Sequence, residues 1–143
     1  MRLLIICTGN TCRSQMAEGI LKSLDNNLEV YSAGTHAEKQ VNPFAVKAMA
    51  ELGINISEQR PEQVDLYLNH AFDYVITVCD GAKEICPVFT GQVKNKLHIG
   101  FEDPAKARGT EEEVMPIYRK IRDQIKERFT VLYNTNIRST PIS

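Results

Sequence analysis

The chain has 143 residues, 43% of them hydrophobic, and a formal net charge of −1. This length suits one domain with one core, and the near-neutral charge argues against a nucleic acid or an anionic membrane as the partner. No apolar run reaches the length of a membrane span, and the N-terminus lacks the pattern of a secretory signal, so we expect a cytoplasmic protein.

The first half of the chain alternates strands with helices. Residues 3–6 form a short apolar run, which predicts a strand that is buried on both faces. A helical pattern begins at Ser14, which we assign as the N-cap of that helix. Residues 28–32 predict a second strand, and Asn42 followed by Pro43 predicts the start of a second helix.

The middle of the chain continues this alternation. Residues 62–68 predict a short helix, and residues 74–78 and 96–99 predict the third and fourth strands. Strands that alternate with helices favour parallel pairing. We therefore expect an α/β fold: a single domain with a four-stranded parallel sheet and helices on both faces.

The last helix has a clear start signal. Thr110 and Glu113 have the spacing of a capping box, and apolar residues follow at helical intervals. Pro116 lies inside this pattern, and we expect it to kink the helix or delay its start. We assign residues 1–134 to the domain and residues 135–143 to a loose C-terminal tail.

The central motif is C-x5-R-S, which runs from Cys7 to Ser14 between the first strand and the first helix. Backbone N–H groups at a helix N-terminus form a nest for anions, and the helix dipole adds to the attraction. We expect Gly9 to take the unusual backbone angles of this nest and Arg13 to contact two oxygens of the anion. The predicted oxyanion-binding residues are Thr8, Gly9, Asn10, Thr11, Cys12 and Arg13.

Cys7 is the candidate nucleophile of this loop. The positive field of the loop favours its thiolate by lowering the pKa, and Ser14 is placed to donate a hydrogen bond to that thiolate. The simpler alternative is a buried cysteine at a strand end beside a helical arginine. The strand–loop–helix context and Ser14 favour the anion site.

A carboxylate follows the fourth predicted strand. The carboxyl ends of parallel strands meet at one rim of the sheet, so Asp103 is expected near Cys7 and Cys79. Asp103 over the anion loop would act as a general acid toward a leaving oxygen. Glu102 competes for this role, and a turn residue before Pro104 is the alternative.

Cys79 and Cys86 form a second cysteine pair. On a helix these residues would lie about 10 Å apart along the axis, too far for a disulfide unless the segment moves. Two small core residues are therefore an open alternative. The spacings C-x4-C and C-x6-C also differ from the short ligand pairs of structural zinc sites.

Taken together, these residues resemble the thioredoxin-coupled arsenate reductases, which share the fold of low-molecular-weight protein tyrosine phosphatases. The resemblance extends from Met1 to about Phe129, nearly the whole chain. The matching stretches are residues 7–19, 31–34, 41–43, 76–79, the pair Cys86 and Pro87, and residues 100–104.

The resemblance implies an oxidoreductase that reduces arsenate through a relay of three cysteines. Cys7 would attack arsenate that is held by the loop and Arg13, and Asp103 would protonate the departing oxygen. Cys79 would then attack Cys7 and release arsenite. Cys86 would attack Cys79, and thioredoxin would reduce the resulting Cys79–Cys86 disulfide.

The resemblance also implies the cofactors and partners. No cofactor is required, although the family often binds potassium near the loop. The corresponding residues here are Asn10, Glu18, Ser32 and Glu62, with Glu62 at a position where the family has Asp. Cys12 has no place in the relay. The expected partners are arsenate and thioredoxin, with no nucleic acid and no membrane, and the expected state is a monomer.

The main alternative is a low-molecular-weight protein tyrosine phosphatase, which hydrolyses phosphate monoesters through a cysteine phosphoenzyme. Phosphatases of this family carry aromatic residues after the Asp-Pro pair, whereas Ala105 and Lys106 follow it here. A phosphatase also has no use for Cys79 and Cys86. A non-catalytic anion-binding or redox-sensing module would need neither this cysteine pair nor Asp103.

Overall fold

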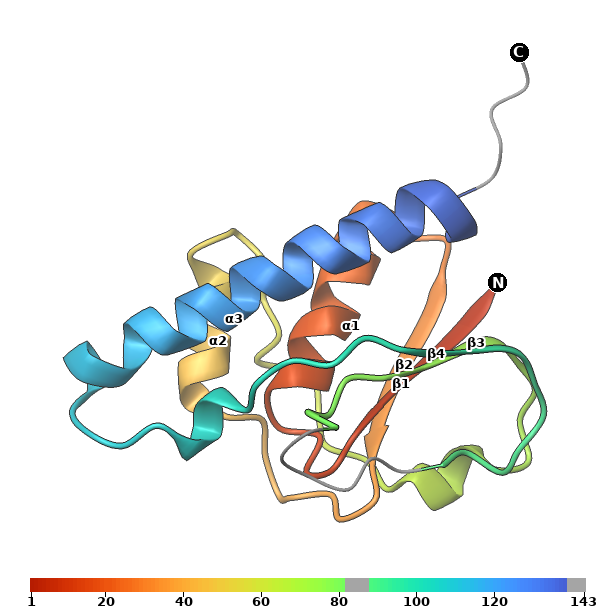
Figure 1. Ribbon diagram of the computed structural model, residues 1–143, viewed down its shortest axis with the longest axis horizontal. Coiled ribbons are helices and arrows are strands. Elements are labelled where there is room, and N and C mark those ends of the chain that lie inside the picture. Colours follow the sequence, from red (N-terminus) through yellow and green to blue (C-terminus); the bar gives the residue numbers. More distant parts are fainter. Residues whose placement is uncertain (82–87, 139–143) are drawn as a thin grey trace.

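The computed structural model describes residues 1–81 and 88–138 (Figure 1). Strands and helices alternate along most of this length, as the sequence predicts. In chain order the elements are β1 (Arg2–Cys7), α1 (Arg13–Leu24), β2 (Glu29–Gly34), α2 (Pro43–Ala50), the 3-10 helix η1 (Val64–Tyr67), β3 (Phe72–Thr77), β4 (Val93–His98), the 3-10 helix η2 (Pro104–Lys106), α3 (Glu111–Leu132) and the π-helical turn η3 (Tyr133–Ile137).

The four strands form one parallel sheet in the order β2-β1-β3-β4, which confirms the predicted α/β fold. Cys7 at the end of β1 is in register with Gly34 at the end of β2. On the other side of β1, Ile6 is in register with Thr77 at the end of β3. The loop that follows β1 therefore begins between the segments that leave β2 and β3.

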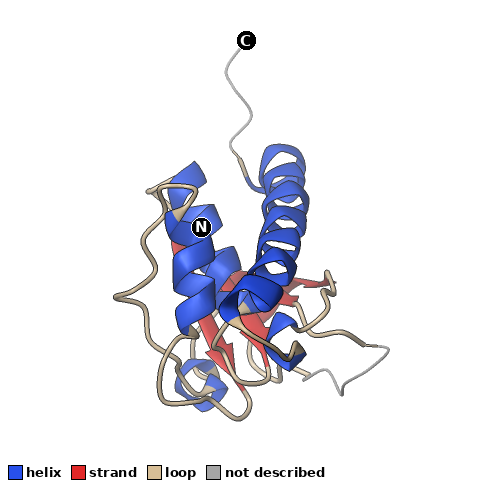
Figure 2. Ribbon diagram, turned by 90° about the vertical axis from the view of Figure 1, so that its left-hand side faces the viewer, coloured by secondary structure: helices blue, strands red, loops and turns tan. Residues whose placement is uncertain are grey.

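Both faces of the sheet are covered, which explains the continuous apolar run in β1. Leu3 and Ile5 point into a core that they share with α1, α2 and α3, while Leu4 and Ile6 point to the opposite face. On that face they meet a smaller cluster that includes Tyr67 of η1. The α-helices lie on one side of the strands (Figure 2), and η1 supplies the helical segment on the other.

Two of the predicted helix starts are confirmed, and one is wrong. The Asn42 side chain caps α2 by accepting from the Phe44 N–H at 2.8 Å. Thr110 and Glu113 form the capping box of α3. Ser14, in contrast, is not an N-cap, because α1 begins at Arg13. The preceding residue in the N-cap position, Cys12, makes no side-chain capping bond.

Pro116 does not delay the last helix. α3 begins at Glu111, five residues before the proline, and continues to Leu132 (Figure 1). Proline lacks the N–H that would bond back to the carbonyl four residues earlier, so this helix forms without one of its backbone hydrogen bonds.

The chain remains helical past residue 134. In η3, Ile137 is buried, and the Tyr133 hydroxyl donates to Asp25 at 2.9 Å. The domain boundary that we place after residue 134 stays a prediction.

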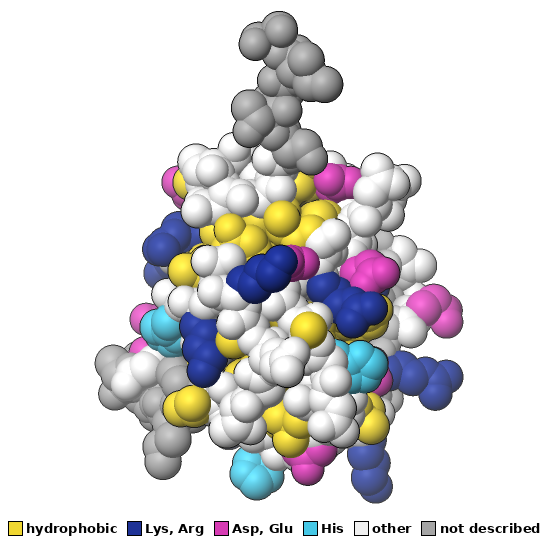
Figure 3. Space-filling model, turned by 90° about the vertical axis from the view of Figure 1, so that its right-hand side faces the viewer, with side chains coloured by type: hydrophobic (Ala, Val, Ile, Leu, Met, Phe, Trp, Pro, Cys, Tyr) yellow, Lys and Arg dark blue, Asp and Glu magenta, His cyan; other side chains and the backbone are white. Residues whose placement is uncertain are grey.

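The described part of the chain contains no helix with the length and apolarity of a membrane span. On the face shown in Figure 3, Lys and Arg side chains are interspersed with Asp and Glu.

Candidate functional site: an oxyanion loop at the end of β1

The loop between β1 and α1 directs its backbone carbonyl oxygens outward. Carbonyls of residues 7–11 each accept a hydrogen bond from a donor outside the loop. The pairs are Thr35 N to Cys7 O at 3.3 Å, His36 N to Thr8 O at 2.9 Å, Glu38 N to Gly9 O at 3.0 Å, Gln15 Nε2 to Asn10 O at 2.9 Å, and Asn42 N to Thr11 O at 2.9 Å. In a trans peptide the carbonyl and the next N–H point in opposite directions. The N–H groups of residues 8–12 are therefore turned into the loop.

This arrangement makes the loop a cradle for an anion. The inward N–H groups lead directly into the N-terminus of α1, where the helix dipole adds positive potential. The first turn of α1 carries no acidic residue and no side-chain cap that would compete with an anion. A tetrahedral oxyanion with several acceptor oxygens matches this geometry.

Asn10, rather than Gly9, takes the left-handed backbone conformation of the loop, with φ of 56°. The prediction for Gly9 is therefore wrong. Asn tolerates this region because its short polar side chain bonds locally, and here the fully buried amide is well supplied with partners. Its Nδ2 donates to Ser14 Oγ at 2.7 Å and Ser32 Oγ at 2.9 Å, and its Oδ1 accepts from Glu62 N at 2.9 Å and Gln15 Nε2 at 3.0 Å.

Arg13 and Asp103 approach each other beside the loop. The Arg13 side chain is 4% exposed, donates to the Phe101 carbonyl at 3.0 Å and lies 3.7 Å from Asp103 Oδ2. The other carboxylate oxygen of Asp103 accepts from Ala105 N at 3.0 Å and caps η2. Glu102, the competing carboxylate, is exposed to solvent. The geometry therefore selects Asp103 as the carboxylate beside the arginine.

The described cysteines lie around the same rim of the sheet. Cys7 and Cys12 are buried thiols that form no disulfide. Cys79 is also buried and is disulfide-bonded. Val78 N bonds to the Ile6 carbonyl at 3.0 Å, so the chain positions of Cys7 and Cys79 lie on adjacent strand ends. Cys86 lies outside the described residues.

Cys12 is held as a neutral thiol. Burial raises its pKa well above the ordinary value, and the Asp103 charge adds to this effect, while Arg13 acts in the opposite direction. This thiol is consequently a poor nucleophile at neutral pH, which agrees with its having no place in the predicted relay.

A cleft of about 670 Å³ lies against the loop at Thr11. Its walls come from the segment that follows β2, from the start of α2 and from η2. The lining residues are Thr11, Glu38, Lys39, Gln40, Val41, Asn42, Pro43 and Ala105, and none of these is aromatic.

Comparison with known proteins identifies the family. Residues 2–140 match the model of the low molecular weight phosphotyrosine protein phosphatases. The chain belongs to this family. It is 49% identical over 131 residues to an arsenate reductase of Halalkalibacterium halodurans, with 91% of this chain and 93% of that protein covered. It is 52% identical over 124 residues to an arsenate reductase of Bacillus licheniformis, with 86% and 88% covered.

Solved structures agree with this assignment to the phosphatase family. An arsenate reductase from Archaeoglobus fulgidus superposes with a TM-score of 0.75 at 27% identity, covering 92% of this chain and 98% of the other. A thioredoxin-dependent arsenate reductase from Corynebacterium glutamicum gives 0.60 at 27% identity, covering 94% and 63%. A low-molecular-weight protein tyrosine phosphatase from T. tengcongensis gives 0.70 at 26% identity, covering 94% and 98%.

The residues predicted for a potassium site are brought together, but they do not fit an ion as arranged. Asn10 directs its amide N–H at Ser32, whose hydroxyl donates to Glu18 at 2.7 Å. The Lys22 ammonium lies 2.5 Å from Glu18 and supplies the positive charge there. The exposed Glu62 carboxylate instead accepts from Tyr67. Potassium would have to displace these contacts, so no step of the reaction is assigned to it.

Two features of the site escape sequence reasoning. Residues 35–42 supply four of the donors that turn the loop carbonyls outward. This close approach depends on Gly34, where a Cβ would lie 2.3 Å from the Thr8 carbonyl oxygen. In the sequence, only the position of Gly34 at the end of a predicted strand indicates this contact between residues 35–42 and the loop.

The second feature is Tyr118 on α3, which is also connected to the loop. No sequence pattern indicates that connection.

Proposed function

We propose that this protein reduces arsenate to arsenite through Cys7, Cys79 and Cys86, and that thioredoxin regenerates it. The observation that carries the proposal is the cradle of inward N–H groups beside the Cys7 thiol, with Cys79 at the end of the adjacent strand. The names of the relatives from Halalkalibacterium halodurans and Bacillus licheniformis support the choice of arsenate as the substrate.

The first step uses the oxyanion loop. Arsenate is tetrahedral and anionic, so its oxygens accept hydrogen bonds from the N–H groups of residues 8–12 and from Arg13. The Cys7 thiolate attacks arsenic and forms a sulfur–arsenic bond. Asp103 donates a proton to the departing oxygen, which leaves as water. Ser14 supports the Cys7 thiolate by donating a hydrogen bond to it. The Ser14 oxygen accepts a hydrogen bond from Asn10, which leaves the hydroxyl hydrogen to point at the thiolate.

The second step transfers electrons to arsenic. The Cys79 thiolate attacks the Cys7 sulfur, a Cys7–Cys79 disulfide forms, and the sulfur–arsenic bond breaks with its electron pair on arsenic. Two thiols are thereby oxidised, and arsenate is reduced by two electrons to arsenite. The electrons come from the cysteines, so the reaction needs no metal or organic cofactor.

The third step prepares the enzyme for thioredoxin. Cys86 attacks Cys79 and restores the Cys7 thiolate, and thioredoxin then reduces the Cys79–Cys86 disulfide. The thioredoxin-dependent relative from Corynebacterium glutamicum supports this source of electrons. We place the reaction in the cytoplasm, where thioredoxin keeps thiols reduced, with the protein as a monomer.

The residues after Asp103 favour the reductase over a phosphatase that acts on aryl phosphates. An aromatic leaving group would stack on aromatic side chains, whereas Ala105 and Lys106 follow Pro104 here. A cysteine phosphoenzyme also makes no use of the buried Cys79.

The test is arsenate-dependent oxidation of NADPH in the presence of thioredoxin and thioredoxin reductase. We expect multiple turnovers from the wild type, none from Cys79→Ser, and at most one turnover from Cys86→Ser. An inactive wild type, or full multiple turnover by either variant, overturns the relay.

A phosphatase assay on the same three proteins separates the two chemistries. Hydrolysis of a small phosphate monoester depends on Cys7 and should not respond to Cys86→Ser. Rapid hydrolysis together with no arsenate reduction would assign the site to a phosphatase.

A further inference from the structure

Tyr118 of α3 is linked to the oxyanion loop through a single residue, Asn42. The Asn42 Nδ2 donates to the Tyr118 hydroxyl at 3.0 Å, and the Asn42 backbone N–H donates to the Thr11 carbonyl at 2.9 Å. Tyr118 is far from the loop in sequence and lies at none of the positions that the proposed reaction uses. The contact nevertheless connects α3 to one wall of the loop.

Asn42 is fixed by three contacts at once. Besides the two bonds to Thr11 and Tyr118, its Oδ1 accepts from the Phe44 N–H at 2.8 Å as the N-cap of α2. A planar amide whose oxygen and nitrogen are both engaged cannot rotate without breaking one of the bonds. Tyr118 therefore restrains the side chain of Asn42 and, with it, the backbone at this position.

The Tyr118 hydroxyl is itself held firmly. The side chain is 3% exposed, and its ring packs against Phe44 with 5.4 Å between the ring centroids. Burial raises the pKa of Tyr118 to about 12, and the Asp103 charge acts in the same direction, opposed by the hydrogen bond from Asn42. The phenol thus stays neutral at any pH at which the protein works.

We propose that Tyr118 is a positioning residue of the oxyanion site. It restrains Asn42, Asn42 holds the Thr11 carbonyl outward, and the planar peptide then directs the Cys12 N–H into the loop. This inference rests on the proposed oxyanion site but not on arsenate reduction. It places part of the control of anion affinity on α3, outside the loop.

The test measures the affinity of the reduced protein for inorganic phosphate, a tetrahedral anion that no thiol reduces. Tyr118→Phe keeps the ring against Phe44 and removes only the hydroxyl. We expect the Kd for phosphate by isothermal titration calorimetry to rise about fivefold, the effect of loosening one hydrogen bond of ordinary strength. An unchanged Kd would overturn the inference.

Tyr133→Phe is the matched control. Tyr133 follows α3 at its far end, and its hydroxyl donates to Asp25 at 2.9 Å. Both variants lose one phenol hydrogen bond, so both should lower the melting temperature slightly. Only Tyr118→Phe should weaken phosphate binding. If both variants weaken it equally, the effect is one of general stability and the inference fails.

Asn42→Ser tests whether Tyr118 acts through Asn42. Serine keeps a capping oxygen for α2 but cannot reach Tyr118. We expect Asn42→Ser to weaken phosphate binding and the double variant to be no weaker than Asn42→Ser alone. If the two effects multiply, Tyr118 does not act through Asn42. If the wild type binds no phosphate, the oxyanion site itself is wrong and the inference fails with it.

Discussion

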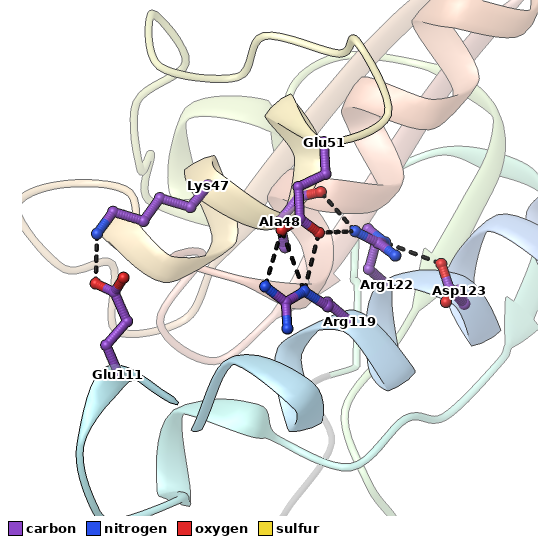
Figure 4. Close-up of polar contacts among 7 residues, drawn as sticks. All are labelled: Lys47, Ala48, Glu51, Glu111, Arg119, Arg122 and Asp123. Atoms are coloured by element: carbon purple, nitrogen blue, oxygen red, sulfur yellow. Dashed lines mark hydrogen bonds and ion pairs between the residues drawn. The ribbon is translucent and has the colours of Figure 1, made fainter. Parts of the chain in front are cut away.

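Two buried arginines of this protein make different kinds of contact. Arg122 on α3 donates to Glu51 at 2.7 Å, Ala48 at 2.8 Å and Asp123 at 2.9 Å (Figure 4). Arg13 at the loop lies 3.7 Å from the Asp103 carboxylate. The close contacts of Arg122 lock α2 to α3, whereas the looser pair at Arg13 can give way to an incoming oxyanion.

The ion cluster around Arg122 is otherwise a surface feature. Glu51 also accepts three hydrogen bonds from Arg119, at 3.0, 3.1 and 3.0 Å, and Lys47 pairs with Glu111 beside it (Figure 4). These partners are about half exposed, so each pair contributes little. The comparison therefore predicts loss of activity at Arg13 and loss of stability at Arg122.

The largest expected effect is that of Arg13→Lys. Lysine keeps the charge but cannot make the two parallel hydrogen bonds of a guanidinium, so arsenate turnover should fall by about 10²–10³. The melting temperature should fall modestly, because lysine lacks the guanidinium that donates to the buried Phe101 carbonyl. Coupled NADPH oxidation and calorimetry measure the two quantities, and a loss of less than tenfold would argue against the role of Arg13 in binding the oxyanion.

Asp103→Asn should have the next largest effect. Asparagine retains the oxygen that caps η2, so the loop after β4 stays in place while the general acid is lost. We expect the rate of arsenite formation in a single turnover to fall about 10²-fold. Glu102→Gln is the control, because that carboxylate is exposed. A greater loss with Glu102→Gln would reassign the acid.

Arg122→Met should reverse the pattern. It leaves the Ala48 carbonyl, a buried acceptor, without its donor, and we expect the free energy of unfolding to drop by about 2 kcal/mol. Urea denaturation measures this change. Arsenate turnover at 25 °C should stay within twofold of the wild type, and a large loss of turnover would mean that the two regions are coupled.

The smallest effect concerns acid stability. Hydrogen bonds from Arg119 and Arg122 lower the pKa of Glu51 below its ordinary value of 4.5. The stability from this carboxylate is present above pH 4.5 and is lost as the pH falls through the lowered pKa. Glu51→Gln should therefore flatten the dependence of the melting temperature on pH below 4.5. An identical slope in both proteins would contradict the pKa shift.

Local patterns in the sequence predicted much of this molecule. The parallel sheet follows from apolar runs that alternate with segments of helical periodicity. Asn42 and Thr110 predict the starts of their helices because capping is a short-range interaction. The placement of Asp103 beside the loop that follows β1 follows from the rule that the carboxyl ends of parallel strands meet. The roles assigned to the cysteines stay predictions until the relay is tested.

The errors occur where distant residues decide a local conformation. Gly9 is the intrinsically permissive residue of the loop, yet Asn10 adopts the positive φ because Ser32 and Glu62 hold its side chain. Ser14 is a favourable capping residue by type, but its hydroxyl oxygen accepts from Asn10 instead. In both cases, the conformational preference of the residue type is outweighed by hydrogen bonds to the buried polar groups of the loop.

The sequence by itself determined the order of the strands and helices along the chain and the position of the loop between β1 and α1. These depend on periodicity, capping and short motifs, which act over a few residues. Only the tertiary structure decided which donors hold the loop carbonyls outward, among them Gln15 and the backbone of residues 35–42. It also connected Tyr118 to the loop. Apart from that of Gln15, such hydrogen bonds join residues far apart in the chain, mostly through backbone atoms that every residue type shares.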